Sequence, residues 1–284
     1  MEITENIARK LIDVQFPGYR NQSIVYLGAG MDNANFRLGA EYLIRLPIRK
    51  ESANLMENEI RWLPFLEPNL PIKIPAPNQT GQPTDFYPWP WTINPWFEGN
   101  SADIENPAAS EISVLIRFLK TLHQFCPDDC PVNPYRGVPL TLKANDVGKR
   151  INSLKPKTRL ITKKIEKLWE IALSAPGPDN DCLIHGDLHS KNIIVKNHQI
   201  EAVIDWGDIT RGDPATDLAI GWMTFNDRKQ REIALNEYGA SQSLTDRAIG
   251  WAIFFGTFFL EIELGENKPA TAIGHQILSN LNEE

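Results

Sequence analysis

Three polar side chains in one stretch of the chain have the types and spacing to bind a metal ion and phosphate. Asp187 and Asn192 lie in a polar loop, and Asp205 follows two β-branched runs at 193–195 and 200–204. A polar turn joins the two runs, so they predict a β-hairpin that brings the three side chains to one end. Carboxylate and amide oxygens suit Mg²⁺, which usually takes one or two carboxylates together with phosphate oxygens. The alternative interpretation is an acidic turn on a hairpin that carries no chemistry.

The elements that must position these side chains change in type along the chain. Apolar spacing predicts helices at 3–15 and 52–66, and short alternating runs predict strands between and after them. A glycine-containing turn at 28–33 separates the first two strands. The expected strands are 23–27, 34–38, 42–46 and 91–96, and the expected later helices are 107–125, 142–154, 161–173, 218–225, 227–238, 245–264 and 269–281.

The segment HGDLHSKN at 185–192, followed by IDW at 204–206, resembles the aminoglycoside phosphotransferase family. These are small-molecule phosphotransferases with a kinase-like fold, and the resemblance extends over nearly the whole chain. It implies an α+β, bilobal protein kinase-like fold with a small antiparallel-sheet N-lobe and a mostly helical C-lobe. The N-lobe, residues 1–97, is then expected to bind the nucleotide. The C-lobe, residues 98–284, is expected to be the catalytic and substrate-binding domain.

The resemblance also assigns expected roles in the N-lobe. Gly28 and Gly30 would cover the nucleotide phosphates with backbone N–H groups, although a Gly-x-Gly turn is found in many hairpins. Arg45 takes the place of the lysine that the family uses to bind phosphate, and a guanidinium can do so through two hydrogen bonds. Lys50 is a less favoured substitute, and a surface role for Arg45 stays open. Glu59, or else Glu57, is expected to be the partner of Arg45. Asn94 and Trp96 are expected at the purine, although the tryptophan side chains of this segment equally suit packing between the lobes.

In the C-lobe the resemblance assigns the chemistry. Asp187 would accept or orient the proton of the attacking hydroxyl, and Asn192 and Asp205 would hold Mg²⁺ on the phosphates of ATP or GTP. His185 would support the loop, Asp217 would hold its backbone, and His189 would either donate to phosphate or pack. Histidines beside carboxylates could also indicate zinc or iron, but the oxygen ligands favour a hard metal. Asp208 is a further candidate, as a supporting acid or as a contact to a cationic substrate.

Composition excludes several other classes of protein. The net charge is −7 and no basic patch stands out in the sequence, so a nucleic-acid partner is not expected. The most apolar run, 248–260, is too short to cross a bilayer and predicts a buried helix. Three cysteines, at 126, 130 and 182, are too few for a disulfide framework and favour a reducing, cytoplasmic location. A monomer or a homodimer is expected.

The sequence therefore predicts an ATP- or GTP-dependent O-phosphotransferase, an enzyme that acts on a hydroxyl of a small molecule. An aminoglycoside-type antibiotic is the favoured acceptor, which would imply a role in antibiotic resistance. The alternatives are a metabolic kinase for a choline-, homoserine- or sugar-like acceptor, and a non-catalytic nucleotide-binding protein. Acidic residues after the motif suit a polyamine sugar and equally suit a solvated helical surface: Asp208, Asp213, Asp227, Glu232, Glu237, Glu261 and Glu263.

Overall fold

The computed structural model describes residues 3–178, 180–265 and 273–284. It divides the chain into two compact units, Met1–Glu98 with Ala202–Gly207, and Gly99–Glu201 with Asp208–Glu284. The first unit contains an antiparallel sheet and two long helices, and the second is mostly helical. This arrangement confirms the expected α+β class.

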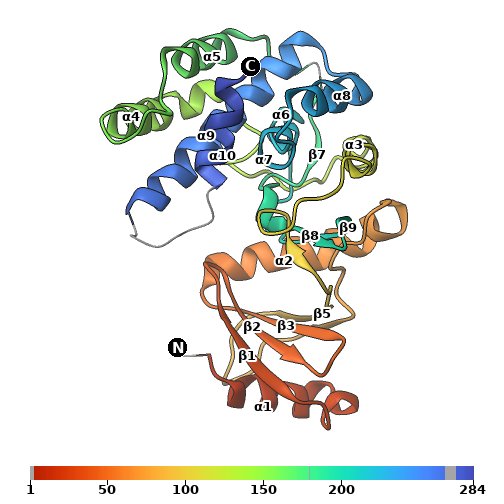
Figure 1. The fold of residues 1–284 in the computed structure, drawn as a ribbon. Helices are drawn as coiled ribbons and strands as arrows, with labels where there is room; N and C mark the ends of the chain where they lie inside the picture. Colours follow the sequence, from red (N-terminus) through yellow and green to blue (C-terminus); the bar gives the residue numbers. More distant parts are fainter. Residues whose placement is uncertain (1–2, 179, 266–272) are drawn as a thin grey trace. The chain divides into compact units, whose positions relative to one another are not determined.

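The first unit is built on a five-stranded antiparallel sheet in the order β1-β2-β3-β5-β4 (Figure 1). Its strands lie close to the predicted ranges. They are β1 (Ile24–Ala29), β2 (Asn33–Leu38), β3 (Tyr42–Pro47), β4 (Gln79–Gly81) and β5 (Trp91–Pro95). The short strand β4 was not expected from the sequence.

The two faces of this sheet pack against different helices. Phe36, Ile44 and Ile93 alternate onto one face, where they form a core with helix α1 (Glu5–Gln15). Arg45 and Thr92 point to the opposite face, which helix α2 (Lys50–Leu66) covers. The strand period of two therefore places the charged residue of β3 on the α2 face, away from the α1 core.

A short segment from late in the chain belongs to the first unit. Residue 202 forms a parallel bridge with Lys73, and the Val203 amide donates to the Lys73 carbonyl over 3.0 Å. Trp206 is fully buried, and its indole N–H donates to the Val203 carbonyl. This packing carries Asp205 into the first unit, whereas the sequence-based division at residue 97 left it with the second.

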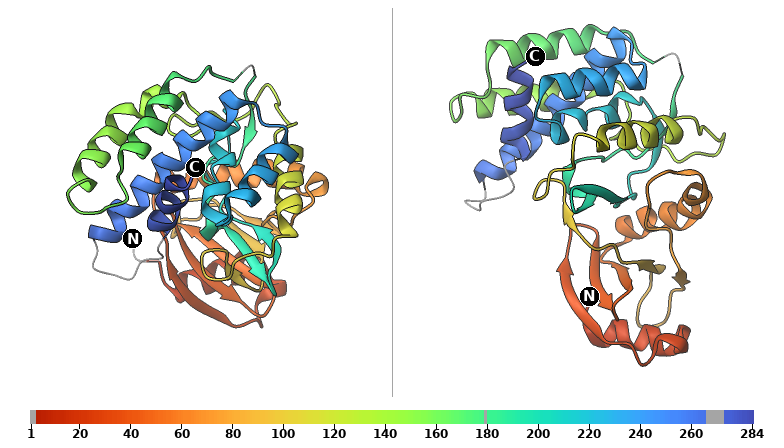
Figure 2. Two further views of the ribbon diagram at one scale, coloured as in Figure 1. Left: turned by 45° about the horizontal axis from the view of Figure 1, so that its top comes forward. Right: turned by 45° about the vertical axis from the view of Figure 1, so that its right-hand side comes forward.

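The second unit surrounds one long apolar helix, α9 (Gln242–Gly265), with shorter helices (Figures 1 and 2). The helices that pack on α9 are α4 (Ala144–Leu154), α5 (Lys163–Ser174), α6 (Ala215–Leu218), α7 (Gly221–Thr224) and α10 (Ile273–Asn282), and α3 (Glu111–Leu122) packs on α8 (Arg228–Tyr238). The helix expected at 218–225 is instead divided into α6 and α7, because i→i+3 hydrogen bonds such as Trp222 N to Ala219 O replace helical ones between them. Residues 269–272 of the last expected helix lie outside the described residues.

The predicted hairpin is present in the structure. It consists of β8 (Ile193–Lys196) and β9 (Gln199–Val203), next to the short strand β6 (Asn100–Ser101). Asn197 and His198 both have positive φ, the conformation of the tight turn that suits the twist of two strands. A second pair, β7 (Cys182–Ile184) and β10 (Thr210–Gly212), flanks the loop that begins at His185.

Helix α9 is the one helix, among those in the described ranges, that has the length and composition to cross a membrane. However, 61% of its most apolar window is buried within the structure. Trp251, Ala252 and Ile253 are fully buried, so its apolar surface is used in packing. The buried helix expected around 248–260 is therefore confirmed.

Candidate functional site

In the first unit, Arg45 forms a buried ion pair with Glu59. Arg45 is 8% exposed and Glu59 is 1% exposed, whereas Glu57 is exposed. The pairing of Arg45 with Glu59, and not with Glu57, is therefore confirmed. Burial lowers the pKa of Arg45, but the Glu59 carboxylate outweighs it and the net effect is to raise that pKa, so Arg45 stays charged.

Asp205 lies beside this pair. Its Oδ1 atom is 3.5 Å from Nη2 of Arg45, and its side chain is 59% exposed. The backbone of Asp205 is left-handed, with φ of 64°, a conformation that aspartate adopts more readily than most residues. The carboxylate of Asp205 is therefore held near a buried cation and remains open to solvent.

The glycine turn between β1 and β2 is closed by its own hydrogen bonds. Gly28 has φ of 129°, which favours glycine, and the strand pairing shifts register between Tyr26 and Gly28. The Gly30 amide donates to the Asn33 carbonyl over 2.9 Å, so in this structure it is not free to bind a phosphate. Asp32 accepts from the Ser52 hydroxyl over 2.8 Å, which fastens the turn to the start of α2.

The end of β5 brings the two expected purine residues together. Asn94 is fully buried and donates its side-chain amide to the Pro75 carbonyl over 2.5 Å, and its Oδ1 atom has no hydrogen-bond partner in the described chain. The Trp96 amide donates to the Glu41 carbonyl over 2.8 Å, because pairing with the β3 side continues past the strand. That amide is therefore engaged, whereas the Phe97 amide makes no hydrogen bond to any described residue.

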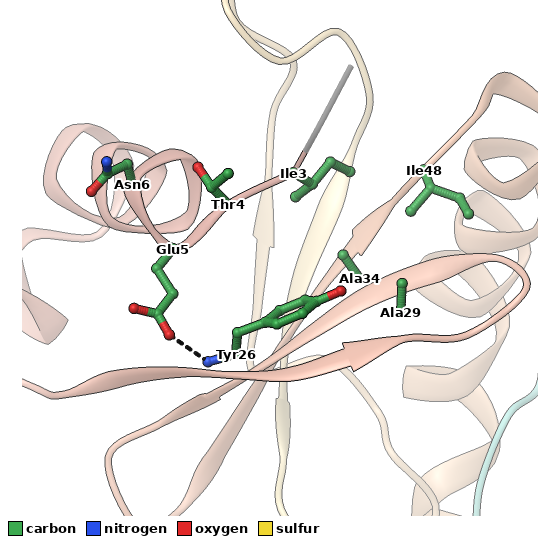
Figure 3. A pocket seen from close by; sticks show the side chains of 8 residues that line it. All are labelled: Ile3, Thr4, Glu5, Asn6, Tyr26, Ala29, Ala34 and Ile48. Carbon is green, nitrogen blue, oxygen red and sulfur yellow. Dashed lines mark hydrogen bonds between the residues drawn. The ribbon is translucent and has the colours of Figure 1, made fainter.

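A cavity of about 540 Å³ in the first unit lies away from these residues. It is lined by residues 3–6 and by Tyr26, Ala29, Ala34 and Ile48 (Figure 3). The Glu5 carboxylate accepts from the Tyr26 amide across it, over 2.8 Å. Ala34 belongs to the α1 face of the sheet, opposite to the face that carries Arg45. We therefore do not assign this cavity to the candidate site.

In the second unit, Asp217 fixes the loop that carries the expected catalytic residue. Its fully buried carboxylate accepts the backbone amides of His185 over 2.7 Å and of Gly186 over 2.9 Å. His123 lies 3.2 Å from the same carboxylate. The expectation that Asp217 holds the backbone of this loop is confirmed, and His123 contacts the same carboxylate from helix α3.

Gly186 is required at its position by both conformation and space. Its φ is 84°, and a Cβ atom there would lie 2.5 Å from the Asp208 carbonyl oxygen. Because residues with side chains rarely adopt this φ, only glycine fits without a shift of the backbone. Gly186 thereby sets the direction in which the chain enters Asp187.

Asp187 is surrounded by hydrogen-bond donors. Its Oδ1 atom accepts from Nη2 of Arg136 over 2.6 Å, and its Oδ2 atom lies 3.5 Å from Nε2 of His189. Its backbone amide donates to Nδ1 of His185, and its carbonyl accepts from the Asn192 side chain over 3.0 Å. Burial alone would raise the pKa of Asp187, but the hydrogen bond from His189 and the charge of Arg136 outweigh it and lower the pKa to about 2.

His185 and His189 contribute differently to this loop. His185 is fully buried and accepts the Asp187 amide, which confirms the expected support of the loop. His189 packs edge-on against Phe259, with ring centroids 5.2 Å apart, and lies 3.4 Å from the Asn192 side-chain nitrogen. Because Nε2 of His189 donates to Asp187, it cannot also accept from Asn192, so in this structure His189 orients Asp187 and packs beside Asn192.

Sequence reasoning missed Arg136. It lies in the loop 126–140, which has no periodicity, and its neighbours in sequence gave no signal of a contact with Asp187. The loop is placed by its backbone: the Asp213 amide donates to the Gly137 carbonyl over 2.9 Å. At Gly137, where φ is 65°, a Cβ atom would lie 2.8 Å from the Gly212 Cα atom. A contact that depends on such long-range backbone packing has no local pattern in the sequence.

Asp208 is also engaged within the second unit. Its Oδ1 atom accepts from the Asn133 side chain over 2.6 Å, and its Oδ2 atom lies 3.7 Å from Nε of Arg136. Arg136 therefore lies between two carboxylates, those of Asp187 and Asp208. This one arginine therefore offsets part of the negative charge of the two carboxylates.

The residues expected to bind Mg²⁺ have suitable chemistry. The exposed carboxylate of Asp205 and the amide oxygen of Asn192 are hard donors of the kind that Mg²⁺ takes alongside phosphate oxygens. Within the ranges that the structure describes, no group of three or more His, Cys, Asp and Glu side chains is placed to hold a metal ion. The donor set therefore fits a metal that arrives with a nucleotide and takes most of its ligands from phosphate and water.

Comparison with known proteins places the chain in a family. A sequence model of the phosphotransferase enzyme family matches residues 23–252. A comparison with curated protein sequences gives no match. The fold and the family together define a small-molecule kinase that acts on hydroxyl groups. The chain belongs to the phosphotransferase enzyme family.

Solved structures share the fold at low sequence identity. The GDP complex of wild-type aminoglycoside 2'-phosphotransferase-IIIa is 18% identical, with a TM-score of 0.71 over 99% of each chain. The streptomycin-ATP ternary complex of APH(2")-IIa is 19% identical, with a TM-score of 0.62 over 98% of this chain and 99% of that one. Macrolide 2'-phosphotransferase MphH from Brachybacterium faecium is 18% identical, with a TM-score of 0.58 over 93% and 92%. The kinase-like fold expected from the sequence is therefore confirmed.

Proposed function

We propose that the protein transfers the γ-phosphoryl group of ATP or GTP to a hydroxyl of a small metabolite. The observation that carries this proposal is the setting of Asp187. Two backbone amides of its loop donate to the buried carboxylate of Asp217, which holds the loop in place. The carboxylate of Asp187 itself is ionised at neutral pH. A fixed carboxylate that accepts a hydrogen bond from a hydroxyl is what phosphoryl transfer requires, because positioning contributes more than covalent help.

The proposed reaction balances with these groups. The hydroxyl oxygen attacks the γ-phosphorus, and the bond to the bridging oxygen breaks, so that its electron pair leaves with the nucleoside diphosphate. Asp187 accepts a hydrogen bond from the hydroxyl and directs a lone pair of its oxygen toward phosphorus. With a pKa near 2, Asp187 is a weak base, so the proton leaves late and passes on to solvent.

We assign the nucleotide to the first unit. Arg45 lies on the α2 face of the sheet as a charged group beside Asp205, which suits a phosphate. The exposed side chain of Val25 lies on the same face, together with Leu43, and offers an apolar surface to a base. The Trp96 amide is already hydrogen-bonded to the Glu41 carbonyl. Successive backbone N–H groups of an extended chain point to opposite sides, so the Phe97 amide is favoured for the purine contact. The side chain of Trp96 then flanks the base, and the buried Asn94 side chain supports the neighbouring backbone through its hydrogen bond to Pro75.

Mg²⁺ would be held by Asn192 and Asp205, and when bound it would neutralise phosphate charge. Asn192 is already oriented for this role, because its amide nitrogen donates to the Asp187 carbonyl, which leaves its oxygen for a cation. Asp205 owes its direction to the left-handed backbone and to the Trp206 anchor. The glycine turn, with Gly28 and Gly30, is proposed to lie over the phosphates once the nucleotide binds.

A metabolic acceptor is favoured over an aminoglycoside by one observation. The Asp187 and Asp208 carboxylates both contact Arg136, so part of the negative charge that would attract a polyamine is already offset within the protein. We further propose a cytoplasmic location, which is supported by the reduced state of Cys126 and Cys182. An antibiotic-resistance role and the oligomeric state stay predictions.

Substitution of Asp187 tests the proposed function. Asp187→Ala is expected to lower acceptor-stimulated release of ADP or GDP by about 10²–10⁴-fold, the range typical of a lost acid–base group. Nucleotide binding, measured by calorimetry, should persist, because the residues assigned to it lie in the first unit. Asp128→Ala, which removes an exposed carboxylate from the second unit, is the matched control and should leave release unchanged. Equal release by wild type and Asp187→Ala would contradict the proposal.

A further inference from the structure

Three cations converge on aromatic rings of helix α9 in the second unit. Arg136 lies 5.4 Å from the centroid of Phe255, Lys143 lies 5.8 Å from that of Phe254, and Arg150 lies 5.2 Å from that of Phe254. Arg136 also lies 6.0 Å from the Phe254 centroid, so one ring faces all three cations. We call Arg136, Lys143, Arg150 and the rings of Phe254, Phe255 and Phe258 the cation–aromatic cluster.

The cluster holds donors that the protein itself does not satisfy. Lys143 is 7% exposed, and within the described residues it forms no hydrogen bond and no ion pair. Nη1 of Arg150 and Nε of Arg136 are buried and also have no hydrogen-bond partner among the described residues. Buried polar groups are normally hydrogen-bonded, and a buried charge is normally paired. Two such buried donors, together with the Lys143 ammonium, surround one ring and indicate a place for an anion.

The carboxylates near the cluster offset its charge only in part. Asp187 and Asp208 share Arg136, and Glu261, which is about half exposed, lies 3.6 Å from Nε of Arg150. Burial lowers the pKa of the Lys143 ammonium, the charge of Arg136 lowers it further, and the exposed carboxylate of Asp146 opposes these effects without reversing them. Cation–π contacts stabilise the cations of the cluster only modestly, and an anion would add charge-assisted hydrogen bonds to them.

The cluster is continuous with the expected catalytic residue. Arg136 contacts both the catalytic candidate and the rings: its Nη2 atom is 2.6 Å from Asp187, and its guanidinium lies over the ring of Phe255. The Phe255 ring is stacked near Phe259, with centroids 6.4 Å apart, and Phe259 packs against His189. A small molecule whose hydroxyl reaches Asp187 therefore brings its other groups to these cations and rings. Tyr135, which is 69% exposed, lies at the edge of the cluster beside Lys143.

We propose that the acceptor is an anionic alcohol whose carboxylate or phosphate group binds Lys143 and Arg150 while its hydroxyl meets Asp187. The proposal rests on the proposed function and adds the substrate class. It disfavours a polycationic acceptor, because each additional ammonium group would meet the same three cations. The aromatic rings then contact the carbon skeleton of the acceptor.

One hexose skeleton with different charges tests the proposal. Glucuronate carries a carboxylate, glucose 6-phosphate a phosphate, glucose no charge and glucosamine an ammonium group. Release of nucleoside diphosphate is measured with each, for the wild type, Lys143→Met and Arg150→Met. Lys149→Met, which removes the same charge from an exposed position on α4, is the matched control. Calorimetric binding of the same four sugars is measured in parallel.

The expected result is a preference of at least tenfold in kcat/KM, or in affinity, for an anionic sugar over glucosamine. This preference should fall toward unity in Lys143→Met and in Arg150→Met and should persist in Lys149→Met. The relative response to glucuronate and to glucose 6-phosphate decides between carboxylate and phosphate. A preference of the wild type for glucosamine overturns the proposal. It is also overturned if Lys143→Met and Lys149→Met prefer the anionic sugar equally, or if the wild type binds neither anionic sugar. Failure of the proposed function is a separate result, in which the sugars bind but no diphosphate is released.

Discussion

At the scale of single residues, the electrostatics of Asp187 depend on a side chain from a distant loop. Burial opposes its charge, and the hydrogen bond from His189 together with the guanidinium of Arg136 reverses that effect. Its pKa of about 2 lies below the ordinary value of 3.8. Because the folded-state pKa is lowered, the ionised group stabilises the fold above the ordinary value, and this stabilisation is lost as pH falls through about 2.

Removal of the Arg136 charge is therefore expected to raise the pKa of Asp187. In Arg136→Met the desolvation of Asp187 remains while the cation that offsets it is gone. A titration of the Asp187 carboxyl carbon by NMR measures the change directly. Arg211→Met, which removes an arginine from β10 in the same unit, is the control and should leave this pKa in place. An Asp187 pKa that is equal in the wild type and in Arg136→Met would show that Arg136 has no such effect.

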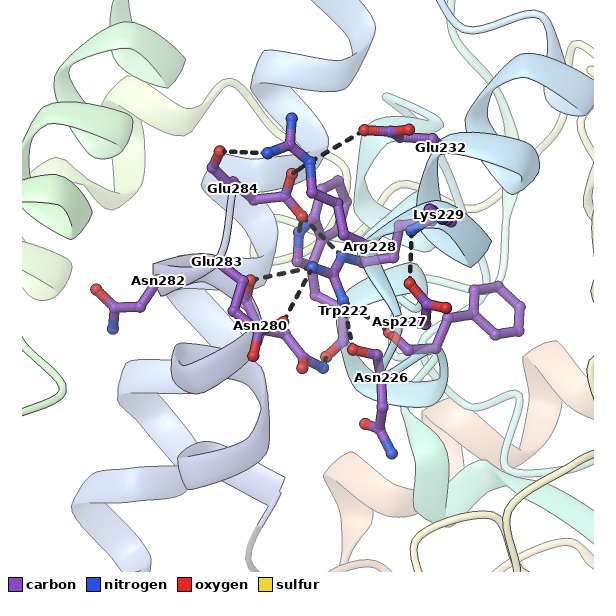
Figure 4. A network of polar contacts seen from close by, with 12 residues as sticks. Trp222, Asn226, Asp227, Arg228, Lys229, Glu232, Asn280, Asn282, Glu283 and Glu284 are labelled. Carbon is purple, nitrogen blue, oxygen red and sulfur yellow. Dashed lines mark hydrogen bonds and ion pairs between the residues drawn. The ribbon is translucent and has the colours of Figure 1, made fainter.

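At the scale of elements, a buried arginine joins helix α8 to the end of helix α10. Arg231 is 2% exposed and donates to the carbonyls of Phe225, Asn226 and Asn280. Its Nε atom donates to the Glu284 carboxylate over 2.7 Å, and that carboxylate also accepts from Trp222. Figure 4 shows residues from α7, α8 and the end of α10 around this carboxylate. The network fixes α8 against α10, which packs on α9.

We expect Arg231→Ala to destabilise the second unit by about 3–5 kcal/mol, the usual cost of leaving one partner of a buried pair alone. Lys229→Ala is the matched control, because Lys229 lies on the same helix and is exposed. That variant should change stability by no more than about 0.5 kcal/mol, as substitutions at exposed positions usually do. The free energies of unfolding in denaturant compare the two variants. Equal losses would mean that burial of the Arg231 network does not set its contribution.

The elements that could be predicted from the sequence are those with local signals. Periodicity gave α2, α8 and α9 within a few residues, and the polar turn between β-branched runs gave the hairpin of β8 and β9. The division of the expected helix at 218–225 and the strand β4 were missed, because both depend on hydrogen bonds to neighbouring segments. Helix α3 begins at Glu111, later than its apolar pattern suggests, since residues 107–110 are taken up in a loop and turn.

The same distinction applies to the candidate site. The motif gave Asp187, Asn192 and Asp205, and the ion pair of Arg45 with Glu59 followed from a strand and a helix with clear patterns. Arg136 and the cation–aromatic cluster were not foreseen, because they assemble from a loop without periodicity, helix α4 and helix α9. The hydrogen bond from the Trp96 amide to the Glu41 carbonyl could not be predicted either, because it depends on where the pairing of two strands ends.

At the scale of the whole molecule, the residues assigned to the nucleotide and those assigned to the acceptor belong to different units. Arg45, Glu59 and Asp205 lie in the first, and Asp187, Arg136 and Asn192 lie in the second. Nucleotide binding should therefore stabilise the protein through the first unit. A ligand at a hundred times its Kd adds about 2.7 kcal/mol to the stability of the state that binds it.

We expect magnesium nucleotide to raise the Tm of the wild type and of Lys50→Met, whose lost charge is exposed at the start of α2. The double variant Arg45→Met with Glu59→Gln should show no such rise. Substitution of both members avoids leaving a buried carboxylate without its partner. Thermal unfolding with and without nucleotide measures the shift. A full rise in the double variant would exclude Arg45 from nucleotide binding.

The central claim is that this chain moves a phosphoryl group to a hydroxyl of a small molecule, and ³¹P NMR of the reaction mixture tests it most directly. With magnesium nucleotide and the four sugars, supplemented by choline, homoserine, an aminoglycoside and a macrolide, we predict a new phosphomonoester resonance. It should grow in step with the nucleoside diphosphate and be absent with Asp187→Ala. Nucleoside diphosphate accompanied only by inorganic phosphate, or an ester formed equally well by Asp187→Ala, would contradict the account.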